Sequence, residues 1–109
     1  MSLFAVIREA GSGWTRGGIT AQPGKSDHAA FMSALADEGF VLFAGPLAGS
    51  EHARVRVLLI VDTDDEAEIN RRLADDPWTV SEQLRIERIE SWNVFVGAER
   101  LRSEPAATA

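Results

Sequence analysis

The order of apolar runs along this chain constrains its fold more than any other feature. Four short runs rich in β-branched and aromatic residues predict strands, and two segments with helix-capping residues predict helices. The strands are expected at residues 3–7, 40–44, 54–61 and 84–96, and the helices at residues 26–38 and 63–76. This β-α-β-β-α-β order is that of a ferredoxin-like sandwich, an α+β fold with both helices on one face of an antiparallel sheet.

Turn residues bound the first helix and the strands. Ser26 offers an N-cap, and Gly39 offers a C-terminal stop. Gly45 and Pro46 are expected to close the second strand because proline cannot donate to a β-ladder. The apolar residues of the last strand change phase partway along it, so we expect a β-bulge near residues 87–88.

The second helix has a signal at each end. The run from Thr63 to Glu66 matches a capping box, in which each of these two side chains bonds to the other residue's backbone N–H. Pro77 disfavours helical geometry in the residue before it, so the helix is expected to end near Asp76.

Length and charge indicate one small acidic domain. The chain has 109 residues, enough for one hydrophobic core and too few for two. We expect the domain at residues 1–98 and a disordered tail at residues 99–109, which contain Pro105 and several small residues. The 11 Lys and Arg against 17 Asp and Glu give a net charge of −6, with no basic cluster, which argues against nucleic-acid binding.

Composition excludes several other classes. Without cysteine there is no disulfide framework, no thiolate metal site and no cysteine nucleophile. The apolar runs are far shorter than the roughly 20 residues that span a bilayer, and Arg8 comes too early for a secretory signal. We therefore expect a cytoplasmic protein that makes no membrane contact.

No cofactor or metal is expected. Gly11 and Gly13 begin a dinucleotide-type fingerprint, but Arg16 stands where the third glycine would be. His52, beside Glu51, lacks a spaced set of further ligands, so a solvated loop histidine is the favoured interpretation.

One face of the predicted sheet needs a cover other than the helices. The third strand is apolar at consecutive positions from Val57 to Val61, which is typical of a strand buried on both faces. Left open, its second face would form a large apolar patch. A homodimer that packs sheet against sheet is the expected cover.

Three short motifs follow one another along the chain: a helix-borne histidine within residues 26–32, the segment 43–47 that contains Gly45-Pro46, and the run Asp75-Asp76-Pro77-Trp78. In this order they resemble the YCII-related (YciI-like) family of the dimeric α/β barrel superfamily. The resemblance covers residues 3–96. It implies a ferredoxin-like fold that assembles as a dimeric α/β barrel, with an active site centred on a histidine and an aspartate.

The resemblance also suggests the residues of a site. It implies His28 and Asp76 as catalytic residues, and acid-base chemistry on chlorinated hydroxylated aromatics in a few members. Pro46 and Trp78 are expected beside the substrate, although burial in the core or at the dimer seam is the commoner fate of a tryptophan. The glycine-rich segment 10–25, which carries Trp14 and Arg16, departs from the family pattern, so the substrate class stays open.

His28 and Asp76 also have readings that do not depend on the resemblance. His28 falls in the first turn of the predicted helix, where the positive end of the macrodipole favours a neutral imidazole that can accept a proton. Asp76 can orient that ring and fix its tautomer. The alternatives are a histidine packed with one hydrogen bond and an aspartate that solvates a helix end, although a carboxylate at a helix C-terminus faces the wrong end of the dipole. In plain ferredoxin-like topology the two meet only if the loop after Asp76 folds back or if they belong to different subunits.

Two hypotheses of different class follow. The first is a cofactor-free enzyme, a lyase or isomerase that transfers a proton on a small, hydroxylated aromatic or anionic molecule. Trp14 and Arg16 would then form a lid that stacks on the ligand and binds its anionic group, unless they belong to a disordered surface loop. The second is a non-catalytic ligand-binding or regulatory protein that uses the same cleft.

Overall fold

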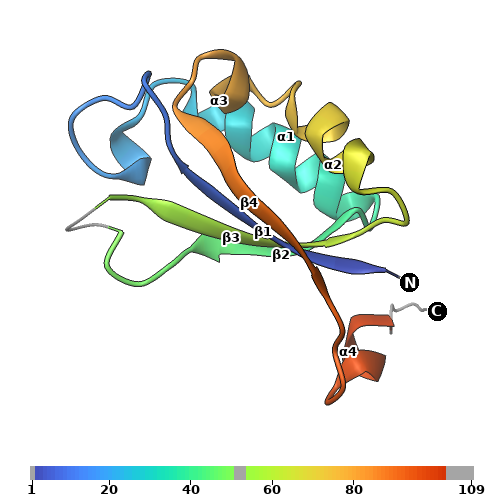
Figure 1. The fold of residues 1–109 in the computed structure, drawn as a ribbon. Coiled ribbons are helices and arrows are strands. Elements are labelled where there is room, and N and C mark those ends of the chain that lie inside the picture. The colour runs from blue at the N-terminus through green and yellow to red at the C-terminus, as the bar shows by residue number, and fades with distance from the viewer. Residues whose placement is uncertain (1, 51–53, 103–109) are drawn as a thin grey trace.

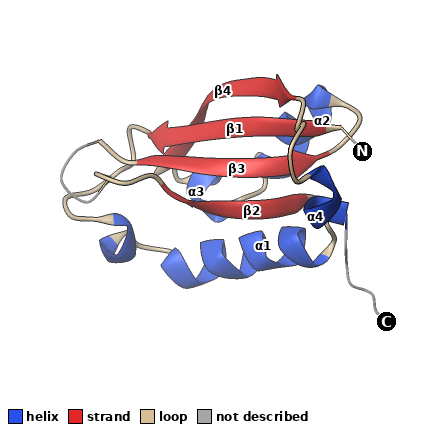
Figure 2. Ribbon diagram, turned by 90° about the horizontal axis from the view of Figure 1, so that it is seen from below, coloured by secondary structure: helices blue, strands red, loops and turns tan. Residues whose placement is uncertain are grey.

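The computed structural model describes residues 2–50 and 54–102. Four antiparallel strands form one sheet in the order β2-β3-β1-β4, and α1, α2 and α3 cover one of its faces (Figures 1 and 2). The predicted ferredoxin-like α+β fold is confirmed. The strands are β1 (Leu3–Ala10), β2 (Val41–Pro46), β3 (Arg56–Asp62) and β4 (Leu84–Trp92). The helices are α1 (Lys25–Asp37), α2 (Glu66–Leu73), α3 (Pro77–Val80) and α4 (Ala98–Arg102), with a short 3-10 turn, η1 (Ile19–Ala21).

The core lies between the sheet and the three helices α1, α2 and α3. Alternate residues of the central strands point into it, because successive side chains of a strand face opposite ways. Val6 of β1 and Leu59 and Val61 of β3 are fully buried, and they pack in one cluster with Ile69 and Leu73 of α2. The helix-facing side of β1 and β3 therefore carries most of the apolar burial.

β4 contains the predicted bulge. Its pairing with β1 shifts between Ile7, opposite Arg88, and Arg8, opposite Ile86, so that Glu87 is the extra residue. The bulge restores the phase of the strand, because Ile86 and Ile89 both pack against the core although three positions separate them.

The predicted end of the last strand, at residue 96, is wrong. β4 stops at Trp92, which pairs with Leu3 at the start of β1, so no residue of β1 remains for the chain to pair with. The following Phe95 and Val96 are each 91% exposed. The short helix α4 follows at residues 98–102, and residues 103–109 of the expected disordered tail lie outside the described part of the chain.

Both predicted helix starts are displaced. α1 begins one residue before Ser26, with Gly24 as its N-cap in the left-handed conformation (φ 79°), so no side chain caps it. The capping box at Thr63 is wrong: Asp65 is the N-cap of α2, and its carboxylate accepts from the N–H of Ala67 at 3.0 Å. Thr63 instead supports the turn before the helix by accepting from the N–H of Asp65 at 3.3 Å.

Candidate active site

His28 and Asp76 meet within a single chain. The Nδ1 atom of His28, in the first turns of α1, lies 2.9 Å from each carboxylate oxygen of Asp76. The contact is possible because the chain folds back after α2 and starts a new helix, α3, which packs against α1. With Nδ1 engaged by the carboxylate, Nε2 is the ring nitrogen left for a substrate proton.

The prediction that Asp76 lies at the C-terminus of a helix is wrong. α2 ends at Leu73, and Asp76 is the N-cap of α3, where its Oδ1 accepts from the N–H of Trp78 at 3.0 Å. Pro77 is the first residue of that helix, a position where proline's missing N–H costs nothing. The carboxylate therefore faces the favourable, positive end of a helix.

Asp76 is fully buried and held by three donors. Arg8 Nη1 donates to its Oδ2 at 2.8 Å, beside the bonds from His28 and from the Trp78 backbone. Burial by itself would raise the pKa of the Asp76 carboxyl, but the hydrogen bonds from His28, Arg8 and Trp78 outweigh it and hold that pKa below the ordinary 3.8. Asp76 is thus an anion in the folded protein.

The indole ring of Trp78 supports the imidazole of His28 by stacking against it. The rings of His28 and Trp78 stack at 4.0 Å between centroids with 11° between their planes. Trp78 is 1% exposed and its indole N–H donates to the Pro23 carbonyl at 2.8 Å. The His28 side chain keeps 16% exposure. The stacking and the contact with Asp76 therefore fix the orientation of an imidazole that stays partly exposed.

Sequence reasoning missed Arg8 and Thr79. The predicted first strand ends at residue 7, yet β1 includes Arg8, which is 1% exposed and continues the buried phase of Phe4 and Val6. Its Nη2 donates to the Thr79 hydroxyl at 2.6 Å. A period-two count carried one step further, from Val6 to residue 8, would have placed an arginine in the core.

The glycine-rich segment is anchored to the turn between α3 and β4. The N–H groups of Gly11 and Gly13 donate to the carbonyls of Gln83 and Glu82 at 2.9 and 2.8 Å. A Cβ at Gly13 would lie 2.0 Å from the Ser81 carbonyl oxygen, so only glycine fits this approach. Buried Gln22 ties the loop together by donating to the carbonyl of Thr15 at 2.9 Å.

The other predicted site residues lie at different depths. Trp14 packs against the core with its ring edge toward Trp78, 6.5 Å between centroids. Arg16 is exposed on the same loop, and no hydrogen bond or ion pair joins it to His28 within residues 2–50 and 54–102. Pro46, at the end of β2, lines a cavity of about 80 Å³ with Ile19, Ser50 and Val55. The structure thus joins His28, Asp76 and Trp78, with Trp14 beside them.

Two further results concern metals and membranes. The described residues contain no group of three or more His, Asp or Glu side chains that could hold a metal ion. His52 lies outside the described residues. Among the described helices, none combines the length and the apolar character needed to cross a membrane.

The low pKa of Asp76 predicts sensitivity to acid. Its folded value lies below 3.8, so the ionised carboxylate stabilises the fold at higher pH, and this contribution is lost as the pH falls through the folded value. We expect the free energy of unfolding of wild type to fall more between about pH 5 and pH 2 than that of Asp76→Asn. Urea unfolding at each pH measures it. Equal losses in the two proteins would contradict the assignment.

Comparison with known proteins supports the fold. No family model matches the sequence, and no curated protein matches it. The structure is similar to that of the 5-chloro-2-hydroxyhydroquinone dehydrochlorinase (TftG) of Burkholderia phenoliruptrix AC1100 in complex with 2,5-dihydroxybenzoquinone. The TM-score is 0.58 at 18% sequence identity, over 84% of this chain and 93% of that one. At this identity the likeness shows the fold alone.

Proposed function

We propose that the chain is a cofactor-free enzyme that transfers a proton on a small molecule, with His28 as the base and Asp76 as the residue that orients it. The observation that carries the proposal is the 2.9 Å contact between His28 Nδ1 and a carboxylate that is itself buried and held by Arg8 and Trp78. Buried, multiply bonded charges beside a partly open histidine are typical of catalytic sites.

The geometry suggests how the proton moves. Asp76 accepts a hydrogen bond from the protonated Nδ1 of His28, which leaves the lone pair on Nε2. Nε2 then takes a proton from the substrate, and the imidazolium that forms lies between the Asp76 carboxylate and the face of Trp78, which both favour a cation. In an isomerase, Nε2 returns the proton to another atom of the same substrate. In a lyase, the bond from the substrate carbon to the leaving group breaks with its electron pair, and the proton on Nε2 passes to the departing group or to water.

A hydroxylated aromatic or anionic substrate is part of the proposal. TftG is named for its action on a chlorinated hydroxyhydroquinone, and this chain shares its fold. Arg16 would bind the anionic group of the ligand, with Trp14 and Pro46 beside the ligand. Trp78 would act from beneath His28, because its ring is buried.

Soaking crystals with small hydroxylated aromatic acids tests the site directly. Density within hydrogen-bond distance of His28 Nε2, together with turnover of the same compound, would support the enzyme. If compounds of the panel bind but none of them is turned over, the second hypothesis, a ligand-binding or regulatory protein, would be favoured. The small exposed fraction of the His28 side chain is the observation that keeps that hypothesis open.

A cytoplasmic location stays a prediction.

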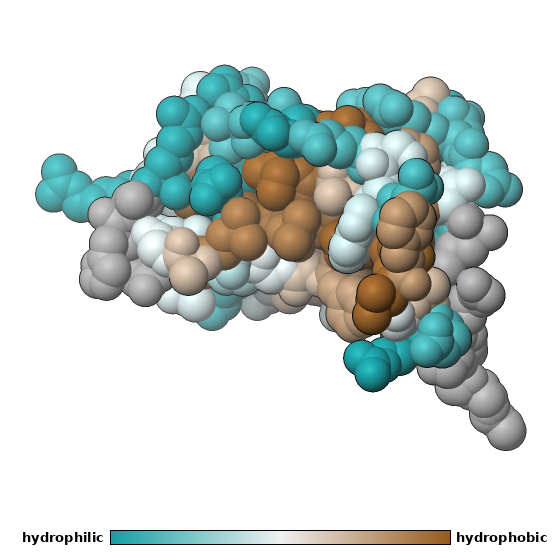
Figure 3. Space-filling model, turned by 60° about the horizontal axis from the view of Figure 1, so that its bottom comes forward, coloured by the Kyte–Doolittle hydropathy of each residue, from teal (hydrophilic) through white to brown (hydrophobic). Residues whose placement is uncertain are grey.

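The proposal includes a homodimer formed through the open face of the sheet. Ala5 and Ile7 of β1 and Leu58 and Ile60 of β3 alternate with core residues, so they point away from the helices. Figure 3 shows apolar side chains gathered on this side of the molecule, and charged residues such as Arg56 and Arg88 lie beside Ala5 and Ile7. A cavity of about 220 Å³ on it is lined by Ala5, Leu58, Ile60 and Trp92, among others.

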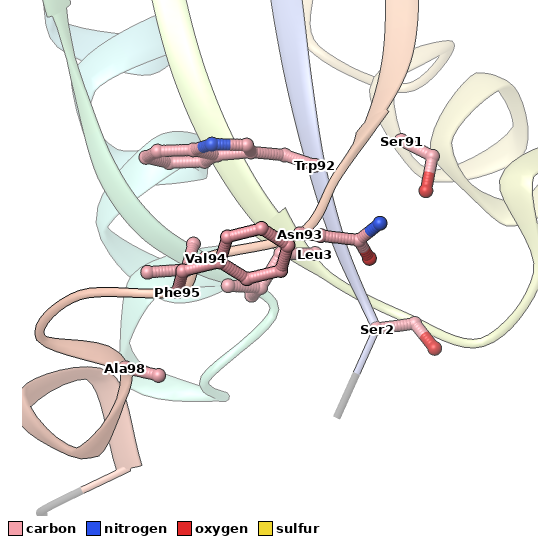
Figure 4. A pocket seen from close by; sticks show the side chains of 8 residues that line it. All are labelled: Ser2, Leu3, Ser91, Trp92, Asn93, Val94, Phe95 and Ala98. Atoms are coloured by element: carbon pink, nitrogen blue, oxygen red, sulfur yellow. The ribbon is translucent and has the colours of Figure 1, made fainter.

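The apolar area continues past the end of β4. Trp92 is 45% exposed, and Phe95 is 91% exposed. Both residues line a second cavity, of about 320 Å³, between the start of β1, the end of β4 and α4 (Figure 4). Sheet-to-sheet packing of two copies would remove these side chains from water.

Leu58→Glu is expected to make the protein a monomer, because a carboxylate at the centre of the open face would be buried unpaired in the dimer. Sedimentation velocity measures the change, with wild type expected as a dimer. Val80→Glu is the matched control: Val80 is 72% exposed on α3, on the helix-covered side, and the same charge there should leave the dimer intact. A monomeric wild type would refute this part of the proposal.

A further inference from the structure

Arg8 is a buried cation that the proposed proton transfer does not use. It lies on the core face of β1, 1% exposed, at a position where a strand of this kind ordinarily carries an apolar residue. Its guanidinium donates two hydrogen bonds to the start of α3. One goes to the carboxylate of Asp76, the N-cap, at 2.8 Å, and the other goes to the hydroxyl of Thr79 at 2.6 Å. A side chain near the end of the first strand is thereby tied to a segment 68 positions along the chain.

This arrangement is costly as a purely structural device. The Nε atom of Arg8 is buried and has no hydrogen-bond partner among the described residues. A buried ion pair with an unsatisfied donor is often no more stable than apolar residues of the same size. Stability alone therefore gives a weak reason for an arginine at position 8.

We infer that Arg8 is a positioning residue of the site, which holds the Asp76 carboxylate ionised and aimed at His28 Nδ1. The inference rests on the proposed function of His28 and extends it to a residue that does not touch the substrate. Asp76 sits where two elements bring side-chain donors together: β1 supplies Arg8 and α1 supplies His28, while α3 supplies only the backbone N–H of Trp78.

The division of contacts on the carboxylate supports this role. Oδ2 accepts from Arg8, Oδ1 accepts from the Trp78 N–H, and His28 Nδ1 lies 2.9 Å from both oxygens. Arg8 is always charged, so it opposes the tendency of burial to neutralise Asp76. The carboxylate then has no tendency to take the proton from His28, and the imidazole alone carries the proton between substrate atoms.

The test follows the carboxyl group itself and needs no substrate. Carbon-detected NMR of the aspartate carboxyl groups gives the titration midpoint of Asp76 in wild type, Arg8→Met and Arg8→Lys. We expect Arg8→Met to move the midpoint upward by at least about one pH unit, a tenfold change in proton affinity. Arg8→Lys, which keeps the charge without the fork geometry, should move it less. An unchanged midpoint in Arg8→Met would overturn the inference.

A second pair of variants covers the case in which Arg8→Met does not fold. Asp76→Asn leaves the arginine buried without its counter-ion, so removing both charges in Arg8→Met/Asp76→Asn should raise the melting temperature above that of Asp76→Asn alone. A double variant that melts below Asp76→Asn would show that the arginine does not act through the carboxylate.

Two results separate this inference from the proposed function. Thr79→Val removes the second acceptor and leaves the charge, so it should move the Asp76 midpoint less than Arg8→Met does. If the Asp76 midpoint shifts as expected while His28 proves dispensable for turnover, the proposed function fails and the role of Arg8 stands. If His28 is essential and the midpoint does not shift, only the inference about Arg8 fails.

Discussion

Replacement of His28 by alanine is expected to lower turnover by about 10²- to 10⁴-fold, the usual contribution of a positioned general base. The fold should survive the change, because the His28 side chain is partly exposed and alanine is a good helix former. Asp76 also keeps its bonds to Arg8 and to the Trp78 backbone. Initial rates on a compound found in the panel measure the loss, and circular dichroism checks the fold.

His28→Asn is the matched control for this prediction. Its side-chain amide can still donate to Asp76, but it offers no basic nitrogen, so a loss equal to that of His28→Ala would assign the effect to proton transfer. Full activity in His28→Asn would instead mean that the ring only holds the carboxylate. If His28→Ala changes ligand affinity and no turnover exists to lose, the ligand-binding hypothesis is the better one.

Replacement of Trp78 by alanine is expected to destabilise the protein by about 3–5 kcal/mol, the usual cost of deleting a large buried aromatic side chain. Trp78 is 1% exposed, belongs to the core cluster, and donates its indole N–H to Pro23. The change also removes the surface on which His28 stacks. Urea-induced unfolding, followed by far-UV circular dichroism, gives the free energy of unfolding.

Trp78→Phe separates the two effects of that substitution. Phenylalanine keeps an aromatic face under His28 and most of the packed volume, and it loses the hydrogen bond to the Pro23 carbonyl. The expected destabilisation is therefore smaller, about 1–2 kcal/mol. Equal losses in Trp78→Phe and Trp78→Ala would show that the hydrogen bond, and not the ring, accounts for the stability.

The fold was predictable because its strands have strong local signals. The apolar run at 3–7 lies within β1, and the run at 54–61 overlaps β3. The change of phase at residue 87 indicated the bulge. The end of β4 was not predictable from its own residues, since it depends on where the partner strand β1 begins. Strand ends depend on the neighbouring strand, whereas strand centres depend on local sequence.

The site was predictable in part. His28 and Asp76 were identified, but their meeting within one chain depends on α3, a helix of four residues that is too short to show a periodic pattern. Asp76-Pro77 does carry a local signal, because aspartate followed by proline is typical of an N-cap and the first helical residue. That signal competed with the reading of Pro77 as the end of the preceding helix.

Arg8 and Gln22 show why the remainder could not be predicted. Each is a polar residue whose burial is decided by partners far away or across a loop: Asp76 and Thr79 for Arg8, and Thr15 for Gln22. Sequence patterns assign polar residues to the surface by default. A buried exception becomes visible only when the tertiary partners are known.

Asp76 combines three tasks in one carboxyl group, as helix cap, counter-ion and contact of the imidazole. In a library selected for new substrates, a change at position 76 that removes the carboxylate would therefore disturb three contacts at once, whatever reaction is selected. Libraries are better directed at exposed loop positions such as Arg16 and Gly18, where a new side chain has room. The same coupling means that, in a copy of the gene drifting without selection for activity, loss of this carboxylate would also remove a helix cap and leave Arg8 without its counter-ion.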